Sequence, residues 1–381
     1  MKIEKFQAKN VRSFKEELNI ELSDFNVFVG ENSTGKSNLI TLILTALQSI
    51  GGSGVNIPPY DGRFPEQSNF SCLIKFDQGD IKEIASTEEF NRLVSESKNP
   101  QVQGIENFRR DIELFSKQPA LQFVSSWSKE KGAMVSQSFP QLPGIQTFSH
   151  SGPIDMGTQN RLNFTSRFFG LVRTQILRKF ITVPDTRDLA VYFSMTPANG
   201  NSPINANSIL TYVAGWMMND RNIYDEFKKL VTEILPRLAD LQVYPAQQMA
   251  NLFVKEETLE HPLPGSELSK GSREIFVLLG AIALARESSL IFIEEPEIHL
   301  HPAAIKKLKT ILLDTVKKKR IQVVISTHHP LFLQDLYPEA DKTVKFFKFE
   351  NQDRSGNHVS EIRTDAEISE LIDKLTMNIG H

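Results

Sequence analysis

The chain has little cysteine and no long apolar run. Cys72 is the single cysteine among 381 residues, which excludes a disulfide framework and a zinc site made of several cysteines, and fits a reducing compartment. The longest apolar run covers residues 275–285, well short of the roughly 18–20 residues that a membrane span requires. The opening MKIEKFQAKN lacks the apolar core of a secretory signal. These absences predict a cytoplasmic, globular protein that does not enter a membrane.

The chain also lacks an excess of charge of either sign. Its formal net charge is -3 at pH 7, which excludes a surface that is basic all over, although a local basic patch is still allowed. Hydrophobic residues make up 40% of the chain, enough to build a large core and to exclude wholesale disorder. The length predicts two to three domains of roughly 100–200 residues each.

Three short apolar runs predict buried parallel strands, because their apolar residues are successive rather than alternating. The runs cover residues 25–29, 290–293 and 321–325, and polar segments that contain GENSTGKS, EEPE and STHHP follow them. Ligand sites of open α/β sheets lie at the carboxyl ends of strands. We therefore expect one pocket assembled from three segments that are far apart in the sequence.

Helical periodicity predicts the remaining organisation. Helices are expected over residues 38–50, 88–98, 105–117, 209–219, 224–238, 272–286 and 303–319, with a hairpin at 345–350 and 358–363 and a helix at 366–375. Residues 140–160 are expected to form a loop. The expected fold class is α/β with a mixed or parallel sheet. Residues 1–87 and 241–381 are expected to form the two lobes of the core, and residues 88–240 a largely helical insertion for dimerisation or partner docking.

A phosphate-binding loop follows the first predicted strand. The segment matches G-x-x-x-x-G-K-[ST] in full, between an apolar strand and an apolar helix. Its glycines allow the backbone to turn and present N–H groups to phosphate oxygens, and the next helix directs its positive dipole end at them. The lysine reaches the β- and γ-phosphates, and the final serine ligates Mg²⁺. The residues are Gly30, Glu31, Asn32, Ser33, Thr34, Gly35, Lys36 and Ser37.

Acidic residues end the second predicted strand. A phosphate-binding loop needs a partner strand that brings an acid to the metal and a group that polarises water. Glu294 fits the metal position, directly or through water, and Glu295 fits the catalytic base. The alternative is a solvated acidic strand end that precedes a helix.

Two further segments complete the expected pocket. Ser269 and Gly271 precede an apolar helix about twenty residues before the acidic strand, so they predict either an ordinary helix cap or a helix start that binds the γ-phosphate. His328 follows the third strand and can sense the γ-phosphate and hold the attacking water; the alternative is a capping or surface histidine.

Two other clusters have alternative interpretations. His299 and His301, with Glu297 nearby, allow either a metal site or a loop at a dimer interface. The basic residues Lys306, Lys307, Lys309 and 317–320 allow either a solvated helix face or direct DNA contact.

The motifs together resemble ABC-type ATPases of the SMC/RecF/OLD branch (OLD: overcoming lysogenization defect). The resemblance rests on KIEKFQAKNVRSF, VFVGENSTGKSNLI, LSKGSREIFVLLGAIALA, LIFIEEPEIHLHP and VVISTHHPLFL, which cover roughly residues 1–50 and 260–340. The EEPE and LHP details are more similar to the OLD-like group than to SMC or RecF. The resemblance implies an ABC-type P-loop NTPase core with ATP and Mg²⁺ as cofactors.

The resemblance also implies roles for single residues. It implies γ-phosphate contact by Ser269 and Gly271, hydrolysis at Glu295 and sensing at His328, and it places Arg12 and Ser13 near the nucleotide. The Q-loop glutamine stays open among Gln67, Gln78 and Gln159, and Arg187, in the segment ITVPDTRD, receives no role.

The resemblance implies an ATPase whose nucleotide lies at the interface of a homodimer or higher homo-oligomer. OLD-type endonucleases continue into a Toprim nuclease domain, whereas no acidic nuclease constellation follows this ATPase. We therefore expect a nucleotide-gated switch that controls a separate effector protein, a nuclease, in prokaryotic anti-phage defence. The alternative is a RecF-like DNA-repair ATPase that itself binds DNA, against which stand the mildly acidic composition and the absence of sustained heptads. The ATPase subunit of an ABC transporter is a third candidate, and the long insertion and the departure from LSGGQ oppose it.

Overall fold

The computed structural model divides the chain into two compact units. The first comprises Met1–Leu22, Ser33–Leu177 and Phe349–Val359, and the second comprises Ser23–Asn32, Arg178–Lys348 and Ser360–His381. The structure describes residues 1–49, 67–99, 105–117, 119–128, 132–138, 156–185, 193–194, 204–205, 221–246, 249–334, 336, 343–352 and 356–379. Among these residues, no helix has the length and apolar content to cross a membrane.

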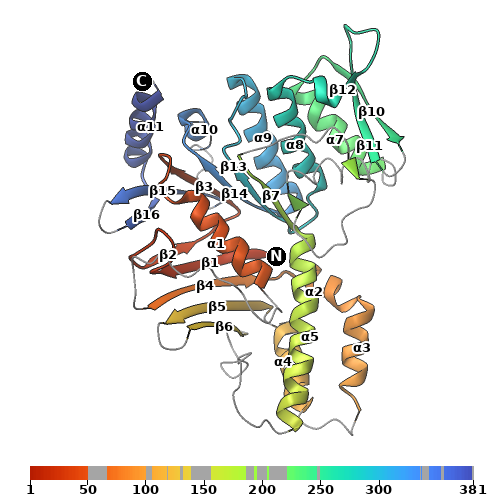
Figure 1. Cartoon of the computed structure of the whole chain (residues 1–381), viewed down its shortest axis with the longest axis vertical. Coiled ribbons are helices and arrows are strands. Elements are labelled where there is room, and N and C mark those ends of the chain that lie inside the picture. The colour runs from red at the N-terminus through yellow and green to blue at the C-terminus, as the bar shows by residue number, and fades with distance from the viewer. Residues whose placement is uncertain are drawn as a thin grey trace. The chain divides into compact units, whose positions relative to one another are not determined.

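An antiparallel sheet of five strands organises the first unit (Figure 1). One face of the sheet is apolar, because alternate residues of each strand point to the same side. On that face the rings of Phe6 and Phe70 stack with centroids 6.1 Å apart, and Phe70 and Phe123 lie 5.8 Å apart. The strand order is β2 (Leu18–Glu21), β1 (Lys2–Lys9), β4 (Gln67–Lys75), β5 (Ala120–Ser128) and β6 (Gly132–Ser138).

Helices supply the rest of the first unit. Asp77 caps α2 and forms a capping box with Asp80, whose carboxylate lies 2.5 Å from the N-terminal amine of Met1. Phe115 of α4 packs against Phe168 of α5, with ring centroids 5.3 Å apart. The helices are α1 (Lys36–Ser49), α2 (Gln78–Ala85), α3 (Glu88–Glu96), α4 (Ile105–Lys117) and α5 (Met156–Arg178).

A seven-stranded sheet forms the centre of the second unit, and its parallel part confirms the three strands predicted from apolar runs. The strand order is β16 (Gly356–Ile362), β15 (Val344–Gln352), β3 (Phe25–Gly30), β14 (Gln322–Thr327), β13 (Leu290–Glu294), β7 (Phe180–Val183) and β9 (Ile204–Asn205). From β3 to β9 all neighbours are parallel. The unit boundary falls within β15 and β16.

Helix α8 (Lys270–Leu284) is buried on all sides from Glu274 onward, as expected for a helix in the middle of a layer. It contacts α7 (Arg221–Ile234) and β7, and α7 also contacts α9 (Pro302–Lys319). The other elements of this unit are α10 (Pro330–Gln334), α11 (Asp365–Ile379), and a smaller sheet of β8 (Phe193–Ser194), β10 (Leu238–Ala246), β11 (Met249–Glu256) and β12 (Leu263–Pro264).

Residues 88–240 contain strands as well as the expected helices. Besides helices, their described part includes β5, β6 and the start of β10, and it supplies β7 to the parallel sheet. β5 alternates buried and half-buried positions in the way of a half-exposed antiparallel strand, a pattern that the sequence analysis did not use. The helix α5 begins at Met156, inside the predicted loop, and the helix predicted at 209–219 lies outside the described residues. The three-segment division of the chain stays a prediction.

Candidate functional site

The carboxyl ends of β3, β14 and β13 lie next to one another in the second unit. Their register pairs Val29 with Thr327, and Ser326 with Glu294. The phosphate-binding loop, the histidine segment (residues 326–330) and the acidic segment (residues 294–297) therefore start at the same edge of one parallel sheet. This is the edge at which open α/β sheets bind ligands.

The phosphate-binding loop connects the last residue of β3 to the first residue of α1. Ser33 and Gly35 have positive φ values of 64° and 96°, so the loop curls its backbone in the way of an anion-binding nest. Helix α1 begins at Lys36 and directs its positive end at the loop. Lys36 is buried and Ser37 is exposed. These features fit a phosphate group, and the Ser37 hydroxyl is an oxygen ligand of the type that Mg²⁺ prefers.

Arg12 lies beside the start of α1 within the first unit. Its Nη1 donates to Asn38 Oδ1 at 3.3 Å, and Asn38 Nδ2 donates to Ser13 Oγ at 2.9 Å. Burial lowers the pKa of Arg12. The structure thus joins Arg12 to Asn38, the residue that directly follows the phosphate-binding motif, and the contact of Arg12 with a nucleotide stays a prediction.

Asn357 of β16 is a neighbour of the loop that the sequence analysis missed. A Cβ on Gly35 would stand 2.4 Å from Asn357 Nδ2 and 2.9 Å from Ser13 Oγ, so a larger residue at position 35 has no room. The contact joins residues more than three hundred positions apart, and no local motif marks it.

The two acids at the end of β13 differ in backbone geometry. Glu294 ends the strand, whereas Glu295 has a φ of 46°, unusual for a residue with a side chain. The amide of Glu295 donates to Ser326 O at 2.8 Å, which holds the turn against β14. His328 Nδ1 lies 3.3 Å from Glu295 Oε1, so the predicted base and the predicted sensor are neighbours.

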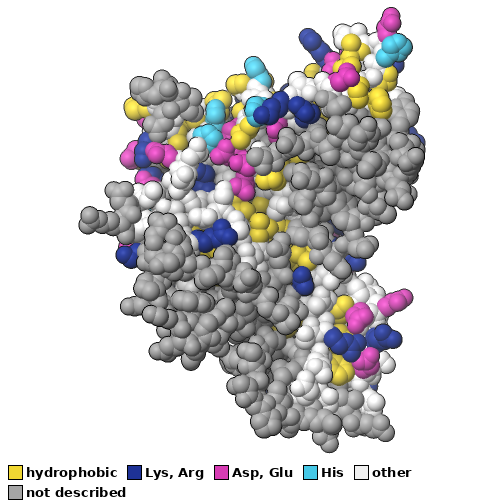
Figure 2. Space-filling model, in the orientation of Figure 1, with side chains coloured by type: hydrophobic (Ala, Val, Ile, Leu, Met, Phe, Trp, Pro, Cys, Tyr) yellow, Lys and Arg dark blue, Asp and Glu magenta, His cyan; other side chains and the backbone are white. Residues whose placement is uncertain are grey.

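Glu297 lies close to Glu295 and His328, and the sequence analysis did not assign it a catalytic role. Its side chain is 6% exposed, and its Oε1 accepts hydrogen bonds from Thr327 Oγ1 at 2.5 Å and from the backbone N of His328 at 3.4 Å. Burial raises the pKa of the Glu297 carboxyl, while the Thr327 hydrogen bond opposes the shift. On the face shown in Figure 2, histidine and carboxylate side chains gather where α9, α10 and β13 lie in Figure 1.

The histidine segment is also held from its other side. The amide of His329 donates to Thr327 Oγ1 at 3.0 Å, and Lys309 of α9 donates to Leu331 O at 2.5 Å. Burial lowers the pKa of His329, and the nearby His328 and Lys309 add to this shift.

Ser269 caps α8, accepting from the backbone N of Ser272 at 3.2 Å, as the ordinary interpretation predicts. The packing of the helix start explains the glycine at position 271, because a Cβ there would stand 2.6 Å from the carbonyl oxygen of His299. His299 Nδ1 also lies 3.7 Å from Glu274 of α8. The helix start is therefore packed against the turn that follows Glu294 and Glu295, and its contact with a nucleotide stays a prediction.

The alternative clusters have mainly structural partners. His301 caps α9 through Ala303 N, and the described residues contain no group of three His, Cys, Asp or Glu side chains that could hold a metal ion. In the basic run, Lys307 donates to Glu233 O, Lys318 pairs with Asp314 and Lys319 pairs with Glu226.

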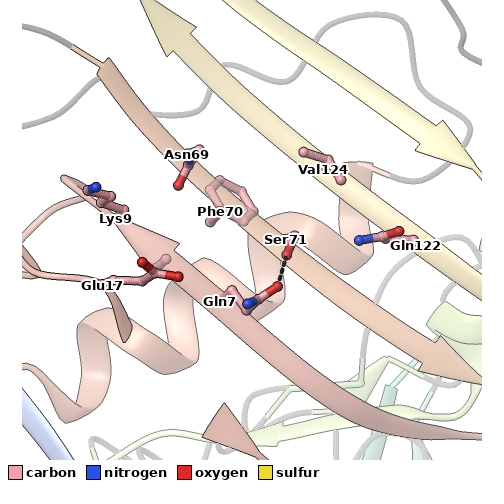
Figure 3. Close-up of a pocket in the computed structure, with 9 residues that line it drawn as sticks. Gln7, Lys9, Glu17, Asn69, Phe70, Ser71, Gln122 and Val124 are labelled. Atoms are coloured by element: carbon pink, nitrogen blue, oxygen red, sulfur yellow. Dashed lines mark hydrogen bonds between the residues drawn. The ribbon is translucent and has the colours of Figure 1, made fainter. Parts of the chain in front are cut away.

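A cavity of about 370 Å³ lies at the five-stranded sheet (Figure 3), lined by Gln7, Ala8, Lys9, Glu17, Asn69, Phe70, Ser71, Gln122 and Val124. Ser71 Oγ donates to Gln7 Oε1 across two strands at 3.3 Å. None of the predicted site residues lines it. Of the candidate Q-loop glutamines, Gln67 begins β4, Gln78 begins α2 and Gln159 lies on α5, so the choice among them stays open. Arg187 lies outside the described residues.

Two family models match the chain. Residues 1–94 match the family described as "AAA ATPase domain", and residues 196–334 match "AAA domain, putative AbiEii toxin, Type IV TA system". The two matches contain the phosphate-binding loop and the acidic and histidine segments, respectively.

Two curated relatives match short parts of the chain. The OLD nuclease of Thermus scotoductus is 32% identical over 91 residues, which are 23% of this chain and 17% of that protein. Protein ea59 of Escherichia phage lambda is 31% identical over 62 residues, 16% of this chain and 12% of that protein. The chain therefore spans less than a fifth of the length of either relative.

Solved structures match over nearly the whole chain. An SMC head bound to the C-terminal winged-helix domain of ScpA matches 96% of this chain and 100% of its own, with a TM-score of 0.58 and 13% identity. An SMC head with an extended coiled coil, bound to the C-terminal domain of ScpA from Pyrococcus furiosus, matches 97% of this chain and 98% of its own. Its TM-score is 0.56 and its identity is 12%. At such identities the likeness concerns the fold alone. Together, the comparisons confirm the resemblance to ABC/SMC-like ATPases related to OLD.

Proposed function

We propose that the chain binds and hydrolyses ATP with Mg²⁺ as a dimeric switch, and that the nucleotide state controls a separate effector, a nuclease, in prokaryotic anti-phage defence. The observation that carries the ATPase part is the register of β3, β14 and β13. It brings the start of the phosphate-binding loop, His328, and the pair Glu294 and Glu295 to one sheet edge. The AAA family matches support the same activity.

The residue roles follow from chemistry and position. Lys36 and the nest of the loop bind the β- and γ-phosphates, and the Arg12 guanidinium adds positive charge near the nucleotide. Ser37 and Glu294 would hold Mg²⁺, which would neutralise the charge that develops on the phosphates. Glu295 takes a proton from the attacking water, and His328, which lies 3.3 Å from it, orients that water and senses the γ-phosphate.

The dimer and the effector belong to the same proposal. Ser269 and Gly271 start a capped helix, which is suited to contact a γ-phosphate held by a second copy. The likeness to OLD nuclease supports a nuclease as the effector. For the alternative, a DNA-binding repair ATPase, the basic run offers little support, because several of its lysines already have protein partners.

Nucleotide binding is tested with Lys36→Ala. The lysine supplies charge to phosphate, so the variant should lose ATP binding in calorimetry while its circular dichroism spectrum stays that of the parent. Equal ATP affinity of variant and parent would overturn the assignment of the loop.

The effector is tested by affinity capture from the native host, with the Glu295→Gln variant loaded with ATP or with ADP. We expect the product of a neighbouring gene, a nuclease, to be retained in one nucleotide state more than in the other. Capture of DNA with no protein partner in either state would favour the repair ATPase instead.

A further inference from the structure

The buried carboxylate of Glu297 joins the two catalytic segments of the second unit. It follows the catalytic acids by two residues, yet its hydrogen bonds go to the end of β14, thirty positions away. Its Oε1 accepts from the Thr327 hydroxyl and from the His328 amide, and it lies 3.9 Å from His328 Nδ1. Its Oε2 is buried without a hydrogen-bond partner among the described residues.

A short chain of hydrogen bonds runs through this carboxylate. The His329 amide donates to Thr327 Oγ1, and the Thr327 hydroxyl then donates to Glu297. Because a hydroxyl accepts and donates at the same time, Glu297 holds the His329 amide through Thr327, while it accepts from the His328 amide directly. The rotation of the His328 imidazole toward Glu295 depends on the backbone that carries it.

Burying a carboxylate costs more free energy than burying an apolar side chain of similar volume. Burying a charged or polar group costs free energy unless its hydrogen bonds repay the cost, and an apolar side chain would fill the same volume without that cost. The arrangement therefore favours a role for which an acceptor is needed at this point. The carboxylate accepts from Thr327 and from His328, both at the end of β14.

We propose that Glu297, acting through Thr327, is a positioning residue that sets the orientation of His328 against Glu295. The kinetic part of this inference rests on the proposed ATPase function. It adds a residue that acts through the backbone of His328, and whose loss should lower turnover without weakening ATP binding.

Thr327→Val is the primary test, because valine has the shape of threonine but neither donates nor accepts. We expect kcat to fall about 10- to 100-fold while the dissociation constant for ATP stays within about threefold. Thr327→Ser keeps the hydroxyl and should restore kcat to within about threefold of the parent. Glu297→Ala should resemble Thr327→Val, and the double variant should be no slower than the slower single variant, since the two residues act as one unit.

Thr315→Val is the matched control. Thr315 is also buried, but its hydroxyl donates to Ile311 O at 2.7 Å, within α9 itself. Its loss should lower the melting temperature and leave kcat unchanged. An equal loss of kcat in Thr315→Val and Thr327→Val would overturn the inference in favour of general destabilisation.

A spectroscopic readout separates this inference from the proposed activity. Long-range ¹H–¹⁵N spectra resolve the ring nitrogens of the eight histidines, and His328→Gln identifies the His328 signals. We expect these signals to move in Thr327→Val and Glu297→Ala, and to stay in place in Thr315→Val. Unchanged His328 signals in both site variants would overturn the positioning role even if the parent is an active ATPase. If the parent hydrolyses no ATP, the proposed function fails, and the same spectra still decide the inference.

Discussion

At the scale of single residues, several residues in the segments of the candidate site have positive φ angles. Ser33, Glu295 and His299 have φ values of 64°, 46° and 59° although each carries a side chain. Such conformations cost of order 1–3 kcal/mol each and persist only where surrounding contacts enforce them. For Glu295 the hydrogen bond to Ser326 O is one such contact. Part of the positive-φ backbone of the described residues thus lies in these segments, and part lies elsewhere, at Asn10, Ser288 and Arg320.

Gly271 and Gly170 give a matched prediction at this scale. A Cβ on Gly271 would meet His299 O at 2.6 Å, so Gly271→Ala should destabilise the protein by about 1–3 kcal/mol. Gly170 lies within α5 with no atom within 4 Å of an added Cβ, so Gly170→Ala should stabilise it by about 0.5–1 kcal/mol. Chemical denaturation measures both changes. Equal stability of the two variants would show that His299 does not restrict the start of α8.

Site residues could be predicted from the sequence where they stand together in one continuous segment. The phosphate-binding loop and the pair Glu294 and Glu295 stand in continuous segments, and the structure brings His328 beside Glu295 as the strand-end argument requires. Glu297 was not predictable as a partner of Thr327, because that contact depends on the register of two strands. The contact of Asn357 with Gly35 joins still more distant segments.

At the scale of elements, continuous apolar runs predicted the buried strands, and strong helical periodicity predicted the helices that pack on them. The three buried strands, α8, α9 and the β15–β16 region lie where the sequence predicts them. The antiparallel strands β1, β4 and β5 were missed, because the sequence analysis relied on continuous apolar runs, whereas β4 and β5 alternate buried and more exposed residues. Helix α5 was missed although its buried residues Phe164, Phe168, Val172 and Ile176 recur at the i, i+4 spacing of a regular helix face.

The lysines at the end of α9 give the prediction at this scale. Lys319 donates to the carbonyls of Ile282, Ala283 and Ala285 at the end of α8 and pairs with Glu226. Lys319→Met should therefore destabilise the protein by about 1–3 kcal/mol, because buried carbonyls lose their donor.

Lys318→Met is the control for this prediction. Lys318 is exposed and only pairs with Asp314 along the helix, so its replacement should change stability by less than about 0.5 kcal/mol. A weaker effect of Lys319→Met than of Lys318→Met would contradict the capping role. A loss of DNA binding in both variants with no change in stability would favour the DNA-contact interpretation of the run.

At the scale of the whole molecule, the account predicts composite sites. The chain contains one phosphate-binding loop and one Ser269 helix start, so two copies facing each other would form two complete pockets. Lys36→Ala and Ser269→Arg should each abolish hydrolysis. In a mixed dimer one pocket carries both lesions and the other carries neither, so mixing the variants should recover activity at about one site per mixed dimer.

Subunit exchange must be shown for that experiment, for instance by resonance energy transfer between labelled copies. Exchange without any recovered hydrolysis, at every mixing ratio, would contradict composite sites that fire independently.

The most direct test of the central claim is steady-state ATP hydrolysis by the purified chain with Mg²⁺, compared with the Glu295→Gln variant, with ATP binding measured on the same samples. The account predicts that the parent hydrolyses ATP. It predicts that the variant binds ATP with similar affinity but turns over about 10²- to 10⁴-fold more slowly, because an amide cannot accept the proton of water. A folded parent that hydrolyses no ATP, or a variant as fast as the parent, would contradict it.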